Sequence, residues 1–246
     1  MSLPVHWVPT LAGVRPGQSV EVEGDEAHHA VVVRRLRTGE RVVLTDGLGT
    51  SVTGTVVETG KRHLGVTAEQ VTSVERPEPS FTVVQALPKG DRGELAVEML
   101  TEVGVTTVVP WAAARSVAVW RGDRAAKALA RWRSTSREAA KQARRAWFPE
   151  VDDLAATGDV AARVGAAALA VVLHEEATEP LATVEVPDHG EVVVVVGPEG
   201  GLTDDEVAAF TAAGGHAVRL GAEVLRTSTA GVAAVSALLA RSPRWQ

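Results

Sequence analysis

Two patterns of apolar and polar positions follow one another along the chain. In the first part, Val and Thr alternate with polar residues at period 2 in short segments separated by glycine, namely "QSVEVE", "RVVLTDG", "SVTGTVVE" and "HLGVTAEQVTSV". This alternation is typical of half-buried β-strands. One helical stretch, "DEAHHAVVVRRLR", interrupts them, with Asp25 as its expected N-cap. The pattern predicts a small β-barrel or sandwich over residues 1–75.

After the proline-containing segment "ERPEPS", which we interpret as a linker, buried strands alternate with helices. The expected strands are "FTVVQAL", "VTTVVP", "AALAVVLH", "EVVVVVG" and "HAVRLG". The expected helices are 91–103, 123–147, one after Gly201 and one through "TAGVAAVSALLA". Two of them begin with a capping-box pattern, Asp91 with Glu94 and Thr203 with Glu206. The alternation predicts an α/β domain over residues 80–246 with a parallel sheet and a ligand at the carboxyl ends of its strands.

The stretch "VVVVVGPEGGLTDDE" places two adjacent glycines between a buried strand and a helix start. Glycines there let backbone N–H groups approach a ligand, although a plain strand-to-helix turn would also use them. The spacing matches neither a P-loop nor a dinucleotide fingerprint. A second turn, "LGAEVLRTSTAG", follows the next strand. Two such loops could enclose one flat, mostly apolar ligand, or be unrelated.

Composition excludes several classes of protein. With 246 residues, 45% hydrophobic and 23% charged, the chain is of ordinary globular type. It contains no cysteine, so disulfides, thiolate metal sites and cysteine nucleophiles are absent. "LHEEATE" does not match HExxH and no GxSxG occurs, which argues against metal-dependent and serine hydrolysis. We see no signal peptide or membrane span and expect a cytoplasmic protein without a metal.

Positive charge is concentrated in one segment. The net charge is −6, yet residues 121–145 carry nine Lys or Arg against two acids, a local charge of +7. Arg133, Arg137 and Lys141 recur at a spacing of four, on one helix face, followed by Arg144 and Arg145. Because this segment offers few acidic partners, we favour a phosphate-binding surface over a solvated face. The N-terminal helical stretch adds basic residues that form a second candidate contact area, namely His28, His29, Arg34, Arg35 and Arg37.

Four segments in order, "RGELAVEMLTEVGV", "REAAKQARR", "VVGPEGGLTDDEV" and "LGAEVLRTSTAGVAA", resemble the RsmE family of ribosomal RNA methyltransferases, of the SPOUT superfamily. The resemblance spans nearly the whole chain. It implies a PUA-like N-terminal barrel and a C-terminal α/β domain whose last segments form a trefoil knot, an exception to the unknotted rule. It also implies a homodimer that uses S-adenosylmethionine to form N3-methyluridine in small-subunit ribosomal RNA, either free or in the assembled subunit.

The resemblance implies which residues form the sites. The cofactor-binding residues would be Leu173, His174, Gly197, Pro198, Glu199, Gly200, Gly201, Leu220, Gly221, Leu225, Arg226 and Thr227. With the basic residues above, the RNA-binding set is His29, Arg34, Arg35, Arg37, Lys89, Arg92, Arg133, Arg137, Lys141, Arg144 and Arg145.

Four positions depart from the family pattern. Ser228 stands where the family usually has Glu, and the others are Met99, Lys141 and Val32. We therefore assign Arg226 to stabilise a uridine anion, leave the general base open, and give Glu199 either a catalytic role or a role in holding its loop. The rival interpretation is an inactive RNA-binding or ribosome-assembly module of the same fold.

Overall fold

The computed structural model describes residues 3–245 of the chain, which divide into two compact units. The first runs to Arg76 and also includes Lys141–Phe148, and the second consists of Pro77–Ala140 and the chain from Pro149 onward. The first boundary lies within the segment that we interpreted as a linker. The return of residues 141–148 to the first unit has no counterpart in the sequence pattern.

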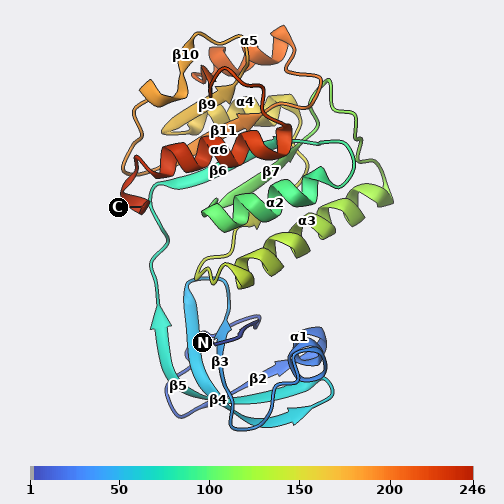
Figure 1. The fold of residues 1–246 in the computed structure, drawn as a ribbon, viewed down its shortest axis with the longest axis vertical. Coiled ribbons are helices and arrows are strands. Elements are labelled where there is room, and N and C mark those ends of the chain that lie inside the picture. Colours follow the sequence, from blue (N-terminus) through green and yellow to red (C-terminus); the bar gives the residue numbers. More distant parts are fainter. Residues whose placement is uncertain (1–2, 246) are drawn as a thin grey trace. The chain divides into compact units, whose positions relative to one another are not determined.

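The first unit is built on a curled five-stranded sheet in the order β1-β3-β4-β5-β2 (Figure 1). Its strands are β1 (Val5–Trp7), β2 (Ser19–Glu23), β3 (Arg41–Thr45), β4 (Thr50–Gly60) and β5 (His63–Ser73). All neighbouring strands pair antiparallel except β1 and β3. One side chain in two points inward from β3, β4 and β5, so the period-2 pattern forms the core of this unit.

A short helical piece closes this core with Ala27 and Ala30. It consists of α1 (Gly24–His28) and a π-helical turn, η1 (His29–Val33). The prediction of an N-cap at Asp25 is wrong, because Glu23 occupies that position and Asp25 lies inside the helix. There Asp25 pairs with Arg62 at 2.7 Å. π-Helical turns are rare and occur often at functional sites, which draws attention to this element.

Residues 146–148 lie against the β3–β4 turn of the first unit. Gly49 N–H donates to Ala146 O (2.9 Å), Phe148 N–H donates to Gly47 O (2.8 Å), and Leu48 forms a bridge with Trp147. These contacts explain why helix α3 (Asp123–Gln142) ends before residue 147, the end that we predicted.

The second unit is a seven-stranded parallel sheet in the order β10-β12-β9-β11-β6-β7-β8. Its strands are β6 (Ser80–Ala86), β7 (Thr107–Trp111), β8 (Glu150–Val151), β9 (Leu169–Leu173), β10 (Glu179–Pro180), β11 (Glu191–Val196) and β12 (His216–Arg219). The short edge strands β8 and β10 were not predicted, since two residues carry no periodicity.

Helices cover both faces of this sheet (Figure 1). They are α2 (Arg92–Val103), α4 (Thr157–Ala166), α5 (Asp204–Ala212) and α6 (Thr227–Leu239), with the short η2 (Leu181–Thr183) and η3 (Pro243–Trp245). In β11, Val192, Val194 and Val196 pack with α2 and α6, whereas Val193 and Val195 pack with α4 and α5. A strand buried on both faces explains the uninterrupted valine run. The helix α4 was not predicted.

The two predicted capping boxes have different outcomes. At α5, Thr203 Oγ1 accepts from Glu206 N–H (3.2 Å) and Glu206 accepts from Thr203 N–H (2.9 Å), so that prediction is confirmed. At α2, Asp91 is the N-cap but its side chain makes no cap bond, and Glu94 pairs with Arg131 instead (3.2 Å).

Within residues 3–245, none of the helices is long and apolar enough to cross a membrane. The same residues contain no group of three or more His, Asp or Glu arranged to hold a metal ion.

Candidate active site

A cavity of about 610 Å³ lies at the carboxyl edge of the parallel sheet in the second unit. Its walls come from the ends of the neighbouring strands β11, β9 and β12 and from the loops that follow them. The starts of α2, α5 and α6 complete the rim with Arg92, Asp204 and Thr227. This is the place where open parallel sheets bind ligands, and the volume is in the range of small-molecule sites.

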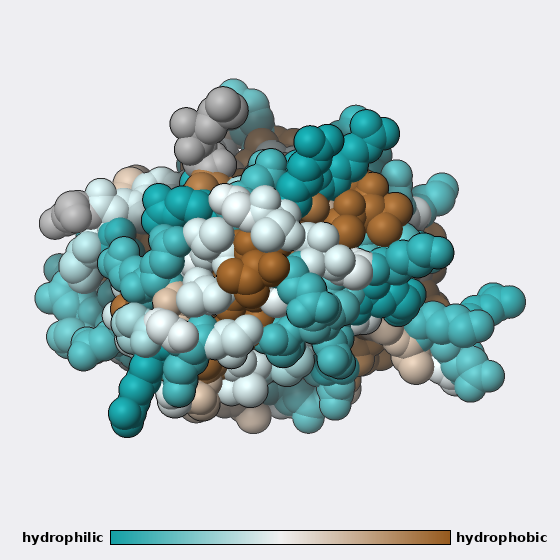
Figure 2. All heavy atoms as spheres, turned by 90° about the horizontal axis from the view of Figure 1, so that it is seen from below, coloured by the Kyte–Doolittle hydropathy of each residue, from teal (hydrophilic) through white to brown (hydrophobic). Residues whose placement is uncertain are grey.

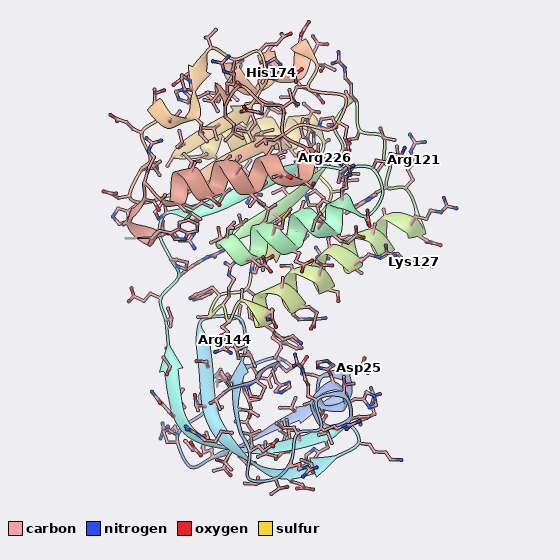
Figure 3. All side chains as sticks on the ribbon, in the orientation of Figure 1. Asp25, Arg121, Lys127, Arg144, His174 and Arg226 are labelled. Atoms are coloured by element: carbon pink, nitrogen blue, oxygen red, sulfur yellow. The ribbon has the colours of Figure 1, made fainter. Side chains whose placement is uncertain are left out.

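Every residue that the sequence predicted as cofactor-binding lies on this cavity, from Leu173 at the end of β9 to Thr227 at the start of α6. Figure 3 labels two of them, His174 and Arg226. Arg92 of the predicted RNA-binding set also lies on the wall. The structure therefore brings the two glycine turns together around one space, and their role in binding a cofactor stays a prediction.

The first turn is shaped by its own backbone. Gly201 N–H donates to Pro198 O (2.9 Å) and Gly201 has φ of 74°, a left-handed conformation that favours glycine. A Cβ at Gly200 would lie 3.0 Å from the Cβ of Arg115. Gly200 thus leaves room for Arg115 on its Cβ side, and its close approach to a ligand in the cavity stays a prediction.

A buried hydrogen-bond chain joins this turn to the start of α6. Thr227 Oγ1 donates to Gly197 O (2.8 Å) and accepts from Gln85 Nε2 (2.9 Å). Gln85 is fully buried in β6, and its Oε1 has no partner within residues 3–245. Because these bonds join β6, β11 and α6, they fix the floor of the cavity from three elements.

The two residues that we singled out in the second turn occupy different environments. Arg226 is the N-cap of α6, its side chain is exposed on the cavity wall, and no hydrogen bond or ion pair engages that side chain among the described residues. Ser228 is only 3% exposed and does not line the cavity. One of the four positions that depart from the family pattern is therefore buried away from the cavity wall.

Glu199 lies on the cavity wall, where one oxygen of its exposed carboxylate accepts from Lys89 N–H (3.1 Å). This bond joins the β11–α5 loop to the β6–α2 loop. It supports the loop-holding role that we left open beside a catalytic one. Lys89 itself does not line the cavity.

Sequence reasoning missed several polar side chains on the wall. These are Arg115, Glu175, Glu176, Asp204, Arg219 and Glu223. Arg115 follows the end of β7, so the rule that ligands bind at the carboxyl ends of parallel strands would have indicated it. The acids near His174 carried no motif, and only the closed fold places them together.

The predicted phosphate-binding face of α3 has partners that lie far away in the sequence. Arg133 donates to Val151 O and to Asp153 Oδ1, each at 3.0 Å. Lys141 is 9% exposed and its Nζ lies 2.9 Å from Glu26. In this structure Lys141 would have to leave Glu26 to contact a phosphate, so its role as a phosphate contact stays a prediction.

The Glu26–Lys141 pair belongs to a buried polar cluster of the first unit. Glu26 also accepts from Trp7 N–H and contacts His6 Nδ1, each at 3.2 Å. Burial alone would raise the pKa of Glu26, but the hydrogen bonds of His6, Lys141 and Trp7 and the charge of Lys141 lower its pKa from 4.5 to about 2. Glu26 is thus ionised at every ordinary pH.

The basic residues at the end of η1 are placed differently. Arg34, Arg35 and Arg37 are exposed, and their side chains make no bond to the rest of the described chain. His29 is half-buried beside them, and Val32 and Val33 are 47% and 59% exposed. Figure 2 shows a face of the molecule on which apolar patches are separated by hydrophilic side chains. Arg144 of the first unit is likewise exposed and has no side-chain bond to the rest of the described chain.

The chain matches known proteins over nearly its full length. A family model described as RNA methyltransferase domain matches residues 75–239, and one described as RNA methyltransferase PUA domain matches residues 22–68. The ribosomal RNA small subunit methyltransferase E of Mycobacterium bovis is 46% identical over 245 residues, 98% of this chain and 93% of the relative. The chain belongs to the RsmE family of RNA methyltransferases. The Bacillus subtilis relative of the same name is 29% identical, with 93% of each chain covered.

Solved structures agree with this family assignment. The chain is similar to a ribosomal RNA small subunit methyltransferase E from Neisseria gonorrhoeae bound to S-adenosylmethionine (TM-score 0.86, 27% identity, 97% of this chain and 98% of that one). It is also similar to a methyltransferase from Legionella pneumophila with the same bound cofactor (TM-score 0.89, 27% identity, 98% and 99% covered). The expected fold is thus confirmed: along the chain, a PUA-like barrel is followed by a SPOUT-type knotted α/β domain.

Proposed function

We propose that this protein transfers the methyl group of S-adenosylmethionine to N3 of a uridine in small-subunit ribosomal RNA. The observation that carries the proposal is the cavity at the carboxyl edge of the sheet, because both family-specific turns line it. The relatives named as small-subunit methyltransferases support the substrate. The related structures with bound S-adenosylmethionine support the cofactor.

The wall of the cavity fits a cofactor with both polar and apolar parts. When bound, S-adenosylmethionine supplies an electrophilic methyl group on a positively charged sulfur. Glu175, Glu176 and Glu223 offer carboxylates to a cationic ligand. Leu173, Leu220 and Leu225 offer apolar surface, and the backbone around Gly197 offers donors and acceptors to the edges of a ring.

For the nucleotide, the chain must orient the uracil and stabilise the charge that develops when N3 loses its proton. Arg226 meets this need, since its guanidinium is exposed on the wall and not neutralised by a neighbour within the described chain. Glu199 holds the loop on which the cofactor would rest. No side chain on the wall is assigned as general base, and solvent water is the simplest acceptor of the proton.

RNA would be bound mainly by the first unit, through His29, Arg34, Arg35 and Arg37, with Arg144 and Arg145 on the segment after α3. Arg133 and Arg137 of α3 and Lys89 and Arg92 near the cavity are further candidates. Among these, the exposed guanidinium groups of Arg34, Arg35 and Arg37 have no acidic partner within the described chain, and such groups attract a phosphate backbone. We include the assembled subunit as a substrate beside the free RNA, and place the reaction in the cytoplasm, where subunits are assembled.

We further propose a homodimer formed by the second unit. This unit leaves large apolar side chains exposed, among them Val117 (62%), Val119 (60%) and Val224 (78%). Isolated exposed valines are ordinary, but Val224 and the 38% exposed Leu225 stand on the loop that lines the cavity. A second copy packed there would cover that loop. Sedimentation of the wild-type protein and of Val224→Glu tests this, because the substitution should shift a dimer to monomer.

The test of the activity uses small subunits and protein-free RNA from a strain that lacks this gene. We expect the purified protein with S-adenosylmethionine to add one methyl group, and nucleoside mass spectrometry to identify N3-methyluridine. Methyl transfer to another base or position would contradict the substrate assignment. RNA binding without any transfer would favour the rival interpretation, an inactive binding module.

A further inference from the structure

Two loops at the carboxyl edge of the sheet are joined by bonds that the sequence did not indicate. The loop after β7 contains Arg115, whose Nη1 donates to Gly200 O and to Leu202 O, each at 3.2 Å. One residue earlier, Ala114 N–H donates to Glu206 Oε1 (2.8 Å). The residues contacted, 200 to 206, are the second half of the turn that lines the cavity and the start of α5.

Glu206 has two tasks because it uses both carboxylate oxygens. Oε2 closes the capping box with Thr203, and Oε1 holds Ala114. The side chain is 3% exposed, so its bonds form out of reach of competing water. The start of α5 is thereby fixed to the loop after β7, and Arg115 is carried to the carbonyls of the turn.

Arg115 adds to the bonds that the turn already has, which are Gly201 N–H to Pro198 O (2.9 Å) and Thr227 Oγ1 to Gly197 O (2.8 Å). Between the two carbonyls that Arg115 binds lies Gly201, which has a left-handed φ and the conformational freedom of glycine. At Gly200 the backbone approaches Arg115 so closely that a Cβ there would lie 3.0 Å from the Arg115 Cβ and 3.3 Å from its carbonyl oxygen. The close packing of Gly200 against Arg115 and the two charge-assisted bonds that Arg115 donates favour a single shape of the turn.

We propose that Arg115 is a positioning residue for S-adenosylmethionine, acting through the turn Gly197–Leu202. It fixes the carbonyls of Gly200 and Leu202, so the cavity wall is formed before the cofactor arrives and less ordering accompanies binding. The proposal rests on the proposed function, since it takes this cavity as the cofactor site. Arg115 also lines the cavity, and a direct contact with RNA phosphate is the alternative that the experiment must separate.

The variants disturb the contact between Arg115 and the turn, some by changing Arg115 and one by changing Gly200. Arg115→Met keeps the aliphatic stem and loses both bonds, and Arg115→Lys keeps the charge on a shorter side chain whose ammonium does not take the place of Nη1. Gly200→Ala disturbs the same contact from the turn. The matched control is Arg121→Met, an exposed arginine on the same loop that makes no bond to another described residue and does not line the cavity (Figure 3).

The measurements are the calorimetric Kd for S-adenosylmethionine, and kcat and KM for each substrate with small subunits. For Arg115→Met and Gly200→Ala we expect the cofactor Kd to rise about tenfold or more, with kcat at saturating cofactor within about threefold of wild type. Arg115→Lys should lie between, and Arg121→Met should have the wild-type Kd for the cofactor. A cofactor Kd within about twofold of wild type for both Arg115→Met and Gly200→Ala overturns the proposal.

The outcomes remain distinct from failure of the proposed function. If wild-type protein does not bind S-adenosylmethionine, the assignment of the cavity is wrong. If wild type binds and Arg115→Met changes only the KM for RNA, Arg115 contacts RNA and the positioning role is wrong. If Arg115→Met does not fold, the Arg115→Lys and Gly200→Ala proteins decide by the same thresholds.

Discussion

At the scale of single residues, Arg226 and Ser228 of the second turn are close in the sequence but have different surroundings in the structure. Arg226 has its side chain on the cavity wall, whereas Ser228 two positions later is buried among helix neighbours. A serine hydroxyl needs a neighbouring base to take up a proton, and the structure shows no hydrogen bond from Ser228 Oγ to a histidine or acid within residues 3–245. The structure therefore gives Ser228 no described partner that would activate it as a base.

The two variants should accordingly behave differently. We expect Ser228→Ala to keep turnover within about tenfold of wild type, or ~1.4 kcal/mol in barrier, and Arg226→Ala to lose about 100-fold or more, because a developing uridine anion loses its counter-charge. Single-turnover methyl transfer to small subunits at saturating cofactor measures both. An inactive Ser228→Ala protein beside a near-normal Arg226→Ala protein would reverse these roles.

Two arginines of the first unit adopt a backbone conformation that suits glycine. Arg35 and Arg144 have φ of 58° and 56° and follow the ends of η1 and α3, where glycine is the usual residue. A side chain in this region costs about 1–2 kcal/mol, more than the ~0.5–1 kcal/mol that glycine's extra chain entropy costs. Retaining arginine at such positions is consistent with a use for the side chain.

Replacing Arg35 with glycine should relieve this backbone strain. The change should therefore stabilise the protein and weaken its binding to RNA. We expect Arg35→Gly to raise the free energy of unfolding by up to ~1 kcal/mol, while its affinity for ribosomal RNA falls. Arg35→Ala is the control, since it removes the charge and keeps the strain, so it should lose affinity without gaining stability. Denaturant unfolding and filter binding give the two values. Unchanged RNA affinity in both variants would mean that Arg35 does not contact RNA.

At the scale of elements, the sequence predicted what depends on neighbours along the chain. Period-2 alternation gave the strands of the barrel, the valine run gave the doubly covered β11, and Thr203 with Glu206 gave the start of α5. The errors occurred where tertiary partners override local pattern. Asp91 has cap chemistry but makes no cap bond, and α3 ends early because residues 146–148 pair with the β3–β4 turn. The glycines indicated the two cavity turns, whereas the bonds from Arg115 to Gly200 O and Leu202 O became known only from the fold.

The buried cluster around Glu26 gives the first unit a defined dependence on acid. The pKa of Glu26 in the folded protein is about 2, below its ordinary 4.5, so its contribution to stability is complete above pH 4.5 and is lost as pH falls through about 2. A shift of this size corresponds to roughly 3 kcal/mol. We expect urea unfolding of the wild type to show this loss between those pH values.

The matched variants isolate the carboxylate. Glu26→Gln should remove most of this pH dependence, and Lys141→Met should destabilise the protein by about 3 kcal/mol or more at neutral pH, because it leaves a buried carboxylate without its cation. Equal acid sensitivity in the wild type and Glu26→Gln would show that other carboxylates control the transition.

At the scale of the whole molecule, charge is distributed differently from what a count along the chain suggests. The segment 121–145 has a net charge of +7, yet Glu94, Asp153 and Glu26 from elsewhere pair with Arg131, Arg133 and Lys141. The shorter basic group Arg34, Arg35 and Arg37 meets no such acid in the described chain. Tertiary pairing, which no local charge count includes, decides which positive surface remains available to RNA.

This distribution makes the salt dependence of RNA binding the measurement that compares the two surfaces. Each phosphate contact that is lost reduces the slope of log K against log salt by about 0.7 to 0.9. We expect Arg34→Gln, Arg35→Gln and Arg37→Gln together to reduce the slope by about 2 to 3, with the Kd for S-adenosylmethionine unchanged.

Lys141→Gln should leave the slope unaltered even though it lowers stability, because that ammonium is already paired with Glu26. Arg133→Gln should have an intermediate effect, since its guanidinium is half exposed but bonded to Asp153. If Lys141→Gln reduces the slope by a full contact in a protein that remains folded, the Glu26–Lys141 pair opens when RNA binds, and the long helix is the main RNA surface after all.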